Sequence, residues 1–398
     1  MEELSQKFFG IPEFDFDLEK KKFIDSMNYL KSLTVEEFTF YKKWAEINQV
    51  YNDSSFISNS NATKARIWTP TDINDEQLTI KEIEQLNPIA RVVRTDDDEQ
   101  TWLQTRIFCH SADYEQTPGR YFKILVEDDN GRILGFAAIA SDIPSMKPRD
   151  EYIGWDKDIR MKGAGQGKIL HSAVGTTIAS TQPLGFNFLG GKLVAGLVTS
   201  KPVRDFWQKS YNNVLVGMTT TSLYGPFSMY NNHKWWHGCG VTAGKVTIKP
   251  DERFYKTWHD WLKEHKSQKY NEMMTQKEGV SGPVTSAKMR VLNMIYGIVG
   301  IRAVNYNHGF ERGIYYSSFY ENTKEFLCGK IEEKELKIKS AVSEDLNSIL
   351  GWWKPKAINR YKKLKSEGRL NSEKLFYDGI YGMAYEDAKK RYFRDVGR

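Results

Sequence analysis

The chain has 398 residues, of which 40% are hydrophobic, 13% aromatic and 27% charged. This composition excludes a disordered or collagen-like chain, because it supplies enough apolar side chains for a core. Three cysteines cannot build a disulfide framework, which favours a reducing compartment. No apolar run reaches about 18 residues, and no signal peptide pattern opens the sequence. We therefore expect a cytoplasmic globular protein without a membrane span, with roughly 150 residues in each of two or three domains.

The formal net charge of +6 is distributed unevenly. The first hundred residues carry a charge of about −8, whereas the last forty-eight carry about +7. Basic residues interleaved with aromatic ones suit a phosphate backbone, so nucleic acid is an expected partner. Attraction between the acidic start and the basic end is the alternative. The aromatic residues of the basic end are Trp352, Trp353, Tyr361, Phe376, Tyr377 and Tyr392.

Three regions follow one another along the chain. Residues 1–85 are expected to form a helical and then loop-like extension, because apolar residues between Leu30 and Ile47 fall at helical spacing. Residues 86–250 alternate between strand and helix patterns and are expected to form the core. Residues 251–398 have a mixed pattern that becomes strongly basic, and their role stays open.

The first half of the core predicts a helix and a hairpin. Residues 89–94 read as a short strand, and the acidic run 96–99 suits the positive end of a helix dipole. Residues 121–126 and 133–139 are expected to pair as strands. Asn130-Gly131 lies between them and tolerates the positive φ angles of a hairpin turn.

The second half of the core contains the predicted functional unit. Strands are expected over 173–179, 214–221 and 244–249, and helices over 188–198 and around Trp207. A bend at 182–187 joins the first of these strands to the first helix. It is expected to present backbone N–H groups and a helix N-terminus to one spot, which suits a pyrophosphate.

This unit resembles the GNAT-type N-acyltransferases, whose pyrophosphate loop reads Arg or Gln, two residues, Gly, one residue, then Gly or Ala. Gln182 and Gly185 match, and Asn187 stands at the last position. The resemblance implies an α/β fold with a mixed central sheet flanked by helices, and an acyl-CoA donor. It also implies that 227–232 form an aromatic helix whose Tyr230 protonates the departing thiolate. The expected donor-binding residues are Gln182, Gly185, Phe186, Asn187, Leu189 and Gly190.

Acyl transfer to an amine also requires a general base. Asp142 at the end of the hairpin, Asp150 and His171 are the candidates, and His171 has the most suitable pKa for the task. Each has a structural alternative: Asp150 can pair with Arg149 or cap a turn, His171 can be a satisfied histidine, and Tyr230 can be a packed aromatic residue.

A second resemblance is to the Druantia DruA-like family, found in anti-phage defence loci and also encoded by phages. It rests on Arg149-Asp150-Glu151-Tyr152-Ile153-Gly154-Trp155 and on the stretch 174–197, and it covers about residues 85–225. It implies a biological setting rather than a reaction.

Three other patterns have competing interpretations. His233 and His237 with Cys239 have a spacing that can bind zinc on a helix, but a fourth ligand is missing, so no metal is expected. The acidic run 96–98 is more simply a helix start than a nuclease site. The segment 160–165 fits the GNAT loop pattern as letters, but it does not follow a clear strand, so it predicts a basic loop or a plain connection.

The sequence therefore predicts acyl-type transfer from a CoA-like donor to an amine, with a nucleic-acid base as the favoured acceptor. The alternative is a GNAT-shaped protein that binds DNA or RNA without catalysis. The donor, the acceptor and the oligomeric state stay open.

Overall fold

A computed structural model describes residues 14–114, 119–162, 167–223, 225, 228–275, 287–339, 346–374 and 377–395. The chain forms two compact units: unit 1 comprises residues 1–38 and 245–309, and unit 2 comprises residues 39–244 and 310–398. These units are defined by contacts within the chain and do not test the predicted division into 1–85, 86–250 and 251–398, which stays a prediction. None of the described helices is both long and apolar enough to cross a membrane.

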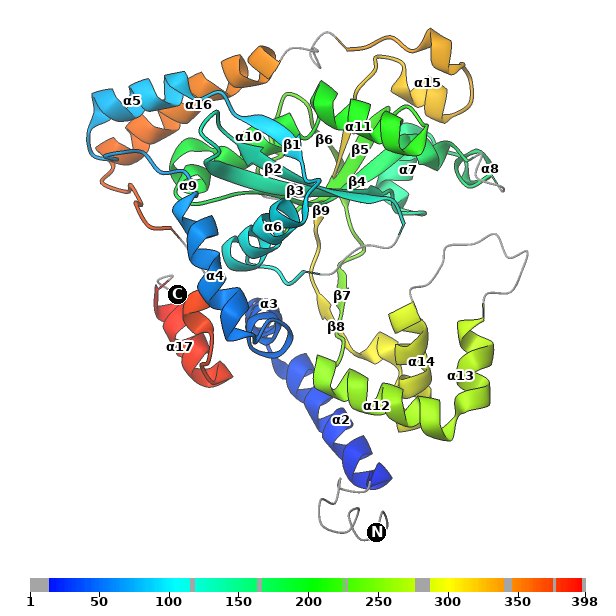
Figure 1. Cartoon of the computed structure of the whole chain (residues 1–398). Coiled ribbons are helices and arrows are strands. Elements are labelled where there is room, and N and C mark those ends of the chain that lie inside the picture. The colour runs from blue at the N-terminus through cyan, green and yellow to red at the C-terminus, as the bar shows by residue number, and fades with distance from the viewer. Residues whose placement is uncertain are drawn as a thin grey trace. The chain divides into compact units, whose positions relative to one another are not determined.

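Unit 2 is built on a seven-stranded mixed sheet (Figure 1) with the order β1-β2-β3-β4-β5-β9-β6. Neighbouring strands are antiparallel except β4 and β5, which are parallel. This arrangement confirms a mixed α/β fold with a central sheet. The strands are β1 (Ile89–Val92), β2 (Tyr121–Glu127), β3 (Ile133–Ser141), β4 (Ser172–Ser180), β5 (Gly217–Thr221), β6 (His237–Val241) and β9 (Gly313–Ser318).

Helices cover both faces of this sheet (Figure 1). On one face, α6 (Asp96–Cys109) packs Trp102 against Leu125 and Phe136. The opposite face packs Ile124 and Ile139 into a larger core with helical residues. Because side chains alternate along a strand, each strand contributes to both cores. The helices of the larger core are α9 (Leu184–Phe188), α10 (Gly190–Leu197), α11 (Lys201–Tyr211) and α16 (Leu346–Ser366).

Shorter helices complete unit 2 and begin with the predicted helical extension. They are α3 (Val35–Ala45, which starts in unit 1), the π-helix η1 (Glu46–Val50), α4 (Ser54–Ala65), α5 (Glu76–Gln85), α7 (Lys147–Ile153), α8 (Lys157–Arg160), η2 (Lys168–His171), α15 (Thr323–Leu327), η4 (Glu333–Glu335), η5 (Tyr377–Ile380) and α17 (Tyr385–Asp395).

Unit 1 is a small helical module with its own core. Trp258 and Leu262 of α12 are fully buried, as are Phe23 of α2 and Ile295 of α14. His308 stands 3.0 Å from the carbonyl of Leu30 and ties the strand pair to α2. The elements are α2 (Phe16–Ser32), β7 (Lys245–Thr247), α12 (Glu252–His265), α13 (Ser267–Met274), α14 (Ala287–Val299), η3 (Ala303–Asn305) and β8 (Asn307–Gly309).

The hairpin and the first core helix are confirmed. Gly131 has φ +70° in the turn between β2 and β3, and Thr95 accepts a hydrogen bond from the Asp98 N–H at the start of α6. The helix expected over 188–198 is confirmed as α10, and the left-handed Leu189 makes it begin two residues later than expected. The strand expected over 244–249 is confirmed as β7, which pairs with β8 outside the main sheet. One local prediction is wrong: residues 228–232 form turns instead of a helix.

Candidate functional site

A buried charged cluster lies where β3 ends and β4 begins. Arg149 is fully buried and donates to Asp142 at 2.7 Å and to Asp150 at 2.6 Å. The second oxygen of Asp142 accepts hydrogen bonds from Ser172 at 2.5 Å and from Thr219 at 2.9 Å. The cluster thus joins β3, α7, β4 and β5, and it brings two predicted base candidates together around one arginine.

A second layer surrounds Asp150. Arg160 forms an ion pair with Asp150 at 2.7 Å, and the backbone N–H of Met146 donates to the same oxygen of Asp150. The indole ring of Trp155 lies below both guanidinium groups, 5.3 Å from Arg149 and 5.9 Å from Arg160. Two arginines therefore balance the two carboxylates in this nearly water-free place.

The carboxylates of this cluster have their acceptor positions filled. Asp142 also accepts from the N–H of Ile143 at 2.8 Å, so each of its oxygens receives two hydrogen bonds. Asp150 receives hydrogen bonds from Arg149 at one oxygen and from Met146 and Arg160 at the other. The alternative in which Asp150 pairs with Arg149 is therefore confirmed. A carboxylate held this way must break a bond before it can take a proton.

His171 lies at the end of η2, directly before Ser172. Its Nδ1 stands 2.9 Å from the carbonyl of Val214, which fixes the proton on Nδ1. Among the described residues no hydrogen bond reaches its Nε2. Burial lowers the pKa of His171, and the Val214 carbonyl opposes that shift. Of the three base candidates, His171 alone is neutral and keeps a free basic nitrogen.

Tyr230 lies on the opposite face of the sheet from Asp142. Thr219 donates to Asp142, while the hydroxyl of the next residue, Thr220, lies 3.4 Å from the Tyr230 hydroxyl. Successive side chains of a strand point to opposite faces, so β5 separates the predicted acid from the charged cluster. Burial raises the pKa of Tyr230, which keeps its proton on the oxygen at neutral pH.

The parallel strands β4 and β5 diverge beside Tyr230. They pair from Ser172 with Gly217 to Gly175 with Thr220, after which β4 continues to Ser180 without β5. At this point the register between β3 and β4 shifts, and Thr176 has no partner residue in either ladder. Bulges of this kind are common next to active sites. Thr220 donates to the Gly175 carbonyl at 3.0 Å, so the Tyr230 hydroxyl is one side chain away from the bulge.

The bend at 182–187 is filled by the protein itself. The Gln182 side chain accepts from the N–H of Phe186, and a side chain at Gly185 would meet the Gln182 amide at 2.7 Å. Asn187 is fully buried and exchanges two hydrogen bonds with the backbone of Asn371. The N–H groups of Gly185 and Asn187 bond to backbone carbonyls. These donors are therefore already used within the chain.

The start of α10 offers a different arrangement. Leu189 has φ 54°, and Gly190 and Gly191 form the first turn after it. A side chain at Gly191 would meet the sulfur of Met229 at 2.7 Å, so the turn 228–232 covers this helix end. Lys192 holds the cover in place by donating to the carbonyls of Met229 and Asn231 at 3.0 and 2.6 Å.

Sequence reasoning missed three residues of this region: Thr176, Lys192 and Thr220. Lys192 follows the glycine pair directly, so a basic residue in the first turn of a helix was an available signal. The positions of Thr176 and Thr220 depend on the register between strands, which cannot be predicted from the sequence pattern.

The remaining sequence patterns lie apart from one another. His233 stands 2.9 Å from the carbonyl of Lys192, whereas the exposed His237 stacks on Tyr152 at the start of β6. Asp98 pairs with Arg91 at 2.7 Å near the start of α6. The described residues contain no group of three or more His, Cys, Asp or Glu placed to hold a metal ion. Positions 163–165 of the basic segment 160–165 lie outside the described residues.

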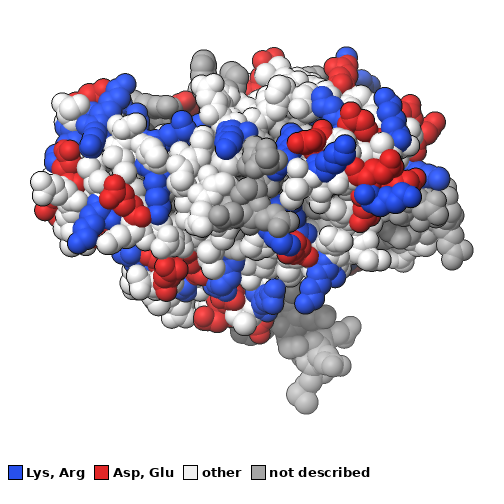
Figure 2. Space-filling model, turned by 90° about the horizontal axis from the view of Figure 1, so that it is seen from above, with Lys and Arg blue, Asp and Glu red and all other residues white. Residues whose placement is uncertain are grey.

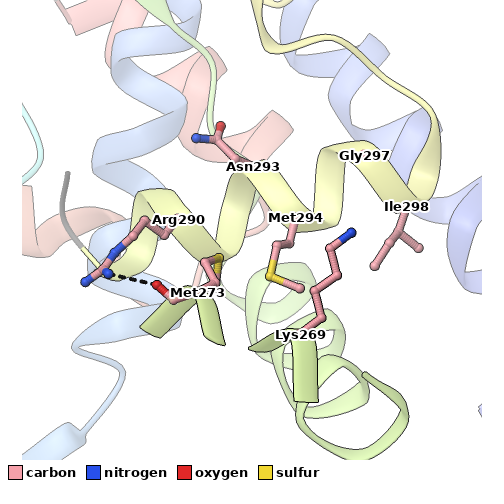
Figure 3. Close-up of a pocket in the computed structure, with 7 residues that line it drawn as sticks. All are labelled: Lys269, Met273, Arg290, Asn293, Met294, Gly297 and Ile298. Carbon is pink, nitrogen blue, oxygen red and sulfur yellow. Dashed lines mark hydrogen bonds between the residues drawn. The ribbon is translucent and has the colours of Figure 1, made fainter. Parts of the chain in front are cut away.

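Unit 1 contains a hollow of about 500 Å³ between α13 and α14 (Figure 3). Arg290 donates to the Met273 carbonyl at 2.9 Å, and the Lys269 side chain runs beside Met294. None of the residues predicted to act in catalysis or donor binding lines it. The lining residues are Lys269, Met273, Arg290, Asn293, Met294, Gly297 and Ile298.

Comparisons with known proteins identify relatives of the sequence. The model of the family "Druantia protein DruA" matches residues 41–329. The Druantia protein DruA of Escherichia coli (strain UMEA 4076-1) is 26% identical over 259 residues, which cover 60% of this chain and 61% of the relative. The chain thus matches less than two thirds of that relative's length. No solved structure matches the chain significantly.

Proposed function

Because the chain belongs to the family of the Druantia protein DruA, we propose that it acts in anti-phage defence, and that its reaction is acyl-type transfer from a CoA-like donor to an amine. The family supports the setting, and the reaction is argued from the residues at the point where β4 and β5 diverge.

The observation that carries the reaction is the position of the Tyr230 hydroxyl. It lies 3.4 Å from Thr220, which bonds to Gly175 at the last paired position of β4 and β5. A departing thiolate needs a proton donor, and burial raises the pKa of Tyr230, so this donor is protonated at working pH. The bulge at Thr176 lies directly beside it.

The proposed step transfers one acyl group from a thioester to an amine. The amine nitrogen attacks the thioester carbonyl carbon, a C–N bond forms and the C–S bond breaks. Tyr230 gives its proton to the sulfur and regains one from solvent. We place at the bulge the backbone N–H that would stabilise the negative charge developing on the carbonyl oxygen.

The anionic part of the donor is assigned to the start of α10. The Lys192 ammonium supplies a positive charge there, and the turn 228–232, which packs on Gly191 and accepts from Lys192, has to move aside for the donor. Leu189 sets the left-handed entry to this turn. The bend 182–187 does not fit a pyrophosphate, since its own side chains and Asn371 occupy its donors.

The base for the amine is not one of the predicted carboxylates, because Asp142 and Asp150 are fully bonded. His171 has a free nitrogen, but five residues of extended chain, about 16 Å, separate it from Thr176. We therefore assign the amine proton to water. A nucleic-acid base is the favoured acceptor, and a protein lysine or a small molecule also has the required nitrogen.

Donor binding is tested by thermal unfolding with acetyl-CoA and with CoA. A ligand at 100 times its Kd stabilises a protein by about 2.7 kcal/mol, which raises Tm by several degrees. Lys192→Gln should reduce this shift, and the exposed Lys209→Gln in α11 should not. If neither acetyl-CoA nor CoA raised Tm, the donor assignment would be refuted. The alternative, a non-catalytic protein that binds nucleic acid, would then remain.

The reaction itself is tested by mass spectrometry of cellular nucleosides with and without expression of the protein. A nucleoside with an added acyl mass, lost in Tyr230→Phe, supports transfer to a base. An acyl group found on protein or on a small amine instead keeps the transfer and changes the acceptor.

A further inference from the structure

A strip of cationic and aromatic side chains crosses the surface of unit 2 along α16. Lys356 lies 5.4 Å from the Trp352 ring, and Arg360 lies 5.5 Å from the ring of Phe186 in α9. Trp352 also contacts Trp235, and Lys234 lies 5.4 Å from that ring. We call these side chains, apart from the buried Trp235, the α16 strip: Phe186, Lys234, Trp352, Lys356 and Arg360.

The cations of the α16 strip keep their charge uncompensated. Within the described ranges, none of Lys234, Lys356 and Arg360 forms an ion pair with a carboxylate. Other lysines of the same helix are paired: Lys365 lies 3.4 Å from Glu76, and Lys363 lies 3.8 Å from Glu367. Uncompensated cations therefore gather at the part of α16 that also carries the aromatic rings.

The spacing along α16 turns these residues into a line. Trp352, Lys356 and Arg360 are four residues apart, so they share one side of the helix over about 12 Å. Phe186 extends the line from α9, and its side chain is 37% exposed. Figure 2 shows the molecule from above, with Lys and Arg side chains at the surface in the region of α5 and α16 and Asp and Glu among them.

We propose that the α16 strip binds single-stranded nucleic acid. Its cations match a phosphate backbone, and the partly exposed rings of Trp352 and Phe186 beside them match bases, which stack on aromatic side chains with little regard to sequence. A base inside a duplex is already stacked on its neighbours and does not offer its face. The combination of charge and accessible rings therefore selects a single strand over a duplex.

This inference does not depend on acyl transfer. The strip shares no residue with Tyr230 or with the first turn of α10, although Trp352 contacts His233, which bonds to the Lys192 carbonyl. A chain without transferase activity would still bind a strand here. If both proposals hold, the strip delivers a strand to the same unit that carries the proposed donor site.

The charge part is tested by fluorescence anisotropy of the full chain with a labelled oligodeoxythymidine of roughly 20 nucleotides, longer than a typical single-strand site. The logarithm of the binding constant should fall linearly with the logarithm of salt concentration. The double variant Lys356→Gln/Arg360→Gln should lower that slope by about 1.4, since each contact with a single strand contributes about 0.7. The matched double variant Lys147→Gln/Lys209→Gln, on exposed residues of α7 and α11, should keep the slope.

The aromatic part is tested by Trp352→Ala, which should weaken binding roughly tenfold at every salt concentration without changing the slope. Circular dichroism melting checks that the variant is folded, and Phe186→Ala provides a second ring variant. A duplex bound as tightly as the single strand, or equal losses in the two double variants, would overturn the proposal. Neither result would bear on acetyl-CoA binding, which is measured separately.

Discussion

The two faces of the β4–β5 pair bury polar side chains in different ways. On the α6 face, four ionised side chains are buried together, and each carboxylate oxygen is bonded. On the α10 face, the polar groups next to β5 are the hydroxyls of Thr220 and Tyr230, and the contact between them is long at 3.4 Å. The charged cluster on the α6 face is held by many short hydrogen bonds, whereas the Tyr230 hydroxyl on the α10 face has one long contact.

The difference shows why a buried carboxylate alone is a poor guide to catalysis. Asp142 and Asp150 look like bases in the sequence, but their bonds to Arg149 make them structural. Breaking such a buried pair leaves an uncompensated charge, which is costly. The Tyr230 hydroxyl, by contrast, has only a long contact with Thr220, so we expect it to contribute little to stability.

The largest expected effect is on the charged face. Arg149→Gln should lower the free energy of unfolding by about 3–5 kcal/mol, because it removes the arginine that pairs with the buried Asp142 and leaves Asp150 with Arg160 alone. Urea denaturation measures the loss. Arg132→Gln is the matched control: Arg132 binds Asp128 at the same 2.7 Å but is 41% exposed, so its pair is worth about 0–1 kcal/mol. Similar losses for both variants would contradict the comparison.

Acid should weaken the α10 face through His233. Burial lowers its pKa to about 4, and the nearby Lys192 charge adds to this shift, whereas the hydrogen bond to the Lys192 carbonyl opposes it. The unfolded state binds the proton more readily, so stability is complete above about pH 6.5 and falls by roughly 3 kcal/mol as the pH drops to 4. The stability difference between wild type and His233→Gln should shrink over that range. A difference that is constant with pH would contradict this assignment.

A smaller loss is expected at the filled bend. Asn187→Leu leaves the backbone N–H and carbonyl of Asn371 without their partner, which should cost about 2 kcal/mol. Asn359→Leu, at an exposed position of α16, should change stability by less than about 0.5 kcal/mol. Wild-type stability in Asn187→Leu would show that the bend is open rather than filled.

The smallest effect on stability is expected for Tyr230→Phe, at less than about 1 kcal/mol. If Tyr230 is the proton donor, the same variant should lower the transfer rate by about 100-fold. Tyr315→Phe tests the reverse: its hydroxyl binds Asn231 at 2.7 Å, so it should lose more stability and keep the rate. If the variant that loses more stability, Tyr315→Phe, also lost more of the transfer rate, Tyr230 would not be the proton donor.

Local signals in the sequence were sufficient for much of unit 2. The Asn130-Gly131 turn and the acidic start of α6 depend on nearby residues, and both are confirmed. The helix expected over 188–198 shows the limit of such signals: apolar spacing places it correctly, but the left-handed Leu189 makes it begin at Gly190.

Long-range partners could not be predicted in this way. Asn187 meets Asn371, Asp142 meets Thr219, and β9 inserts between β5 and β6 from far along the chain. Each pairing depends on sheet register or on helix docking rather than on neighbouring letters. The filled bend and the separation of Asp142 from Tyr230 by β5 follow from these contacts.

The chain leaves the large sheet at Gly244 and returns at Phe310, whose N–H donates to the Gly244 carbonyl at 2.8 Å. The exit and the entry are thus one hydrogen bond apart. An insertion whose two ends lie this close together leaves the register of the strands on either side undisturbed. β6 and β9 therefore pair as neighbours although the whole of 245–309 lies between them in the sequence.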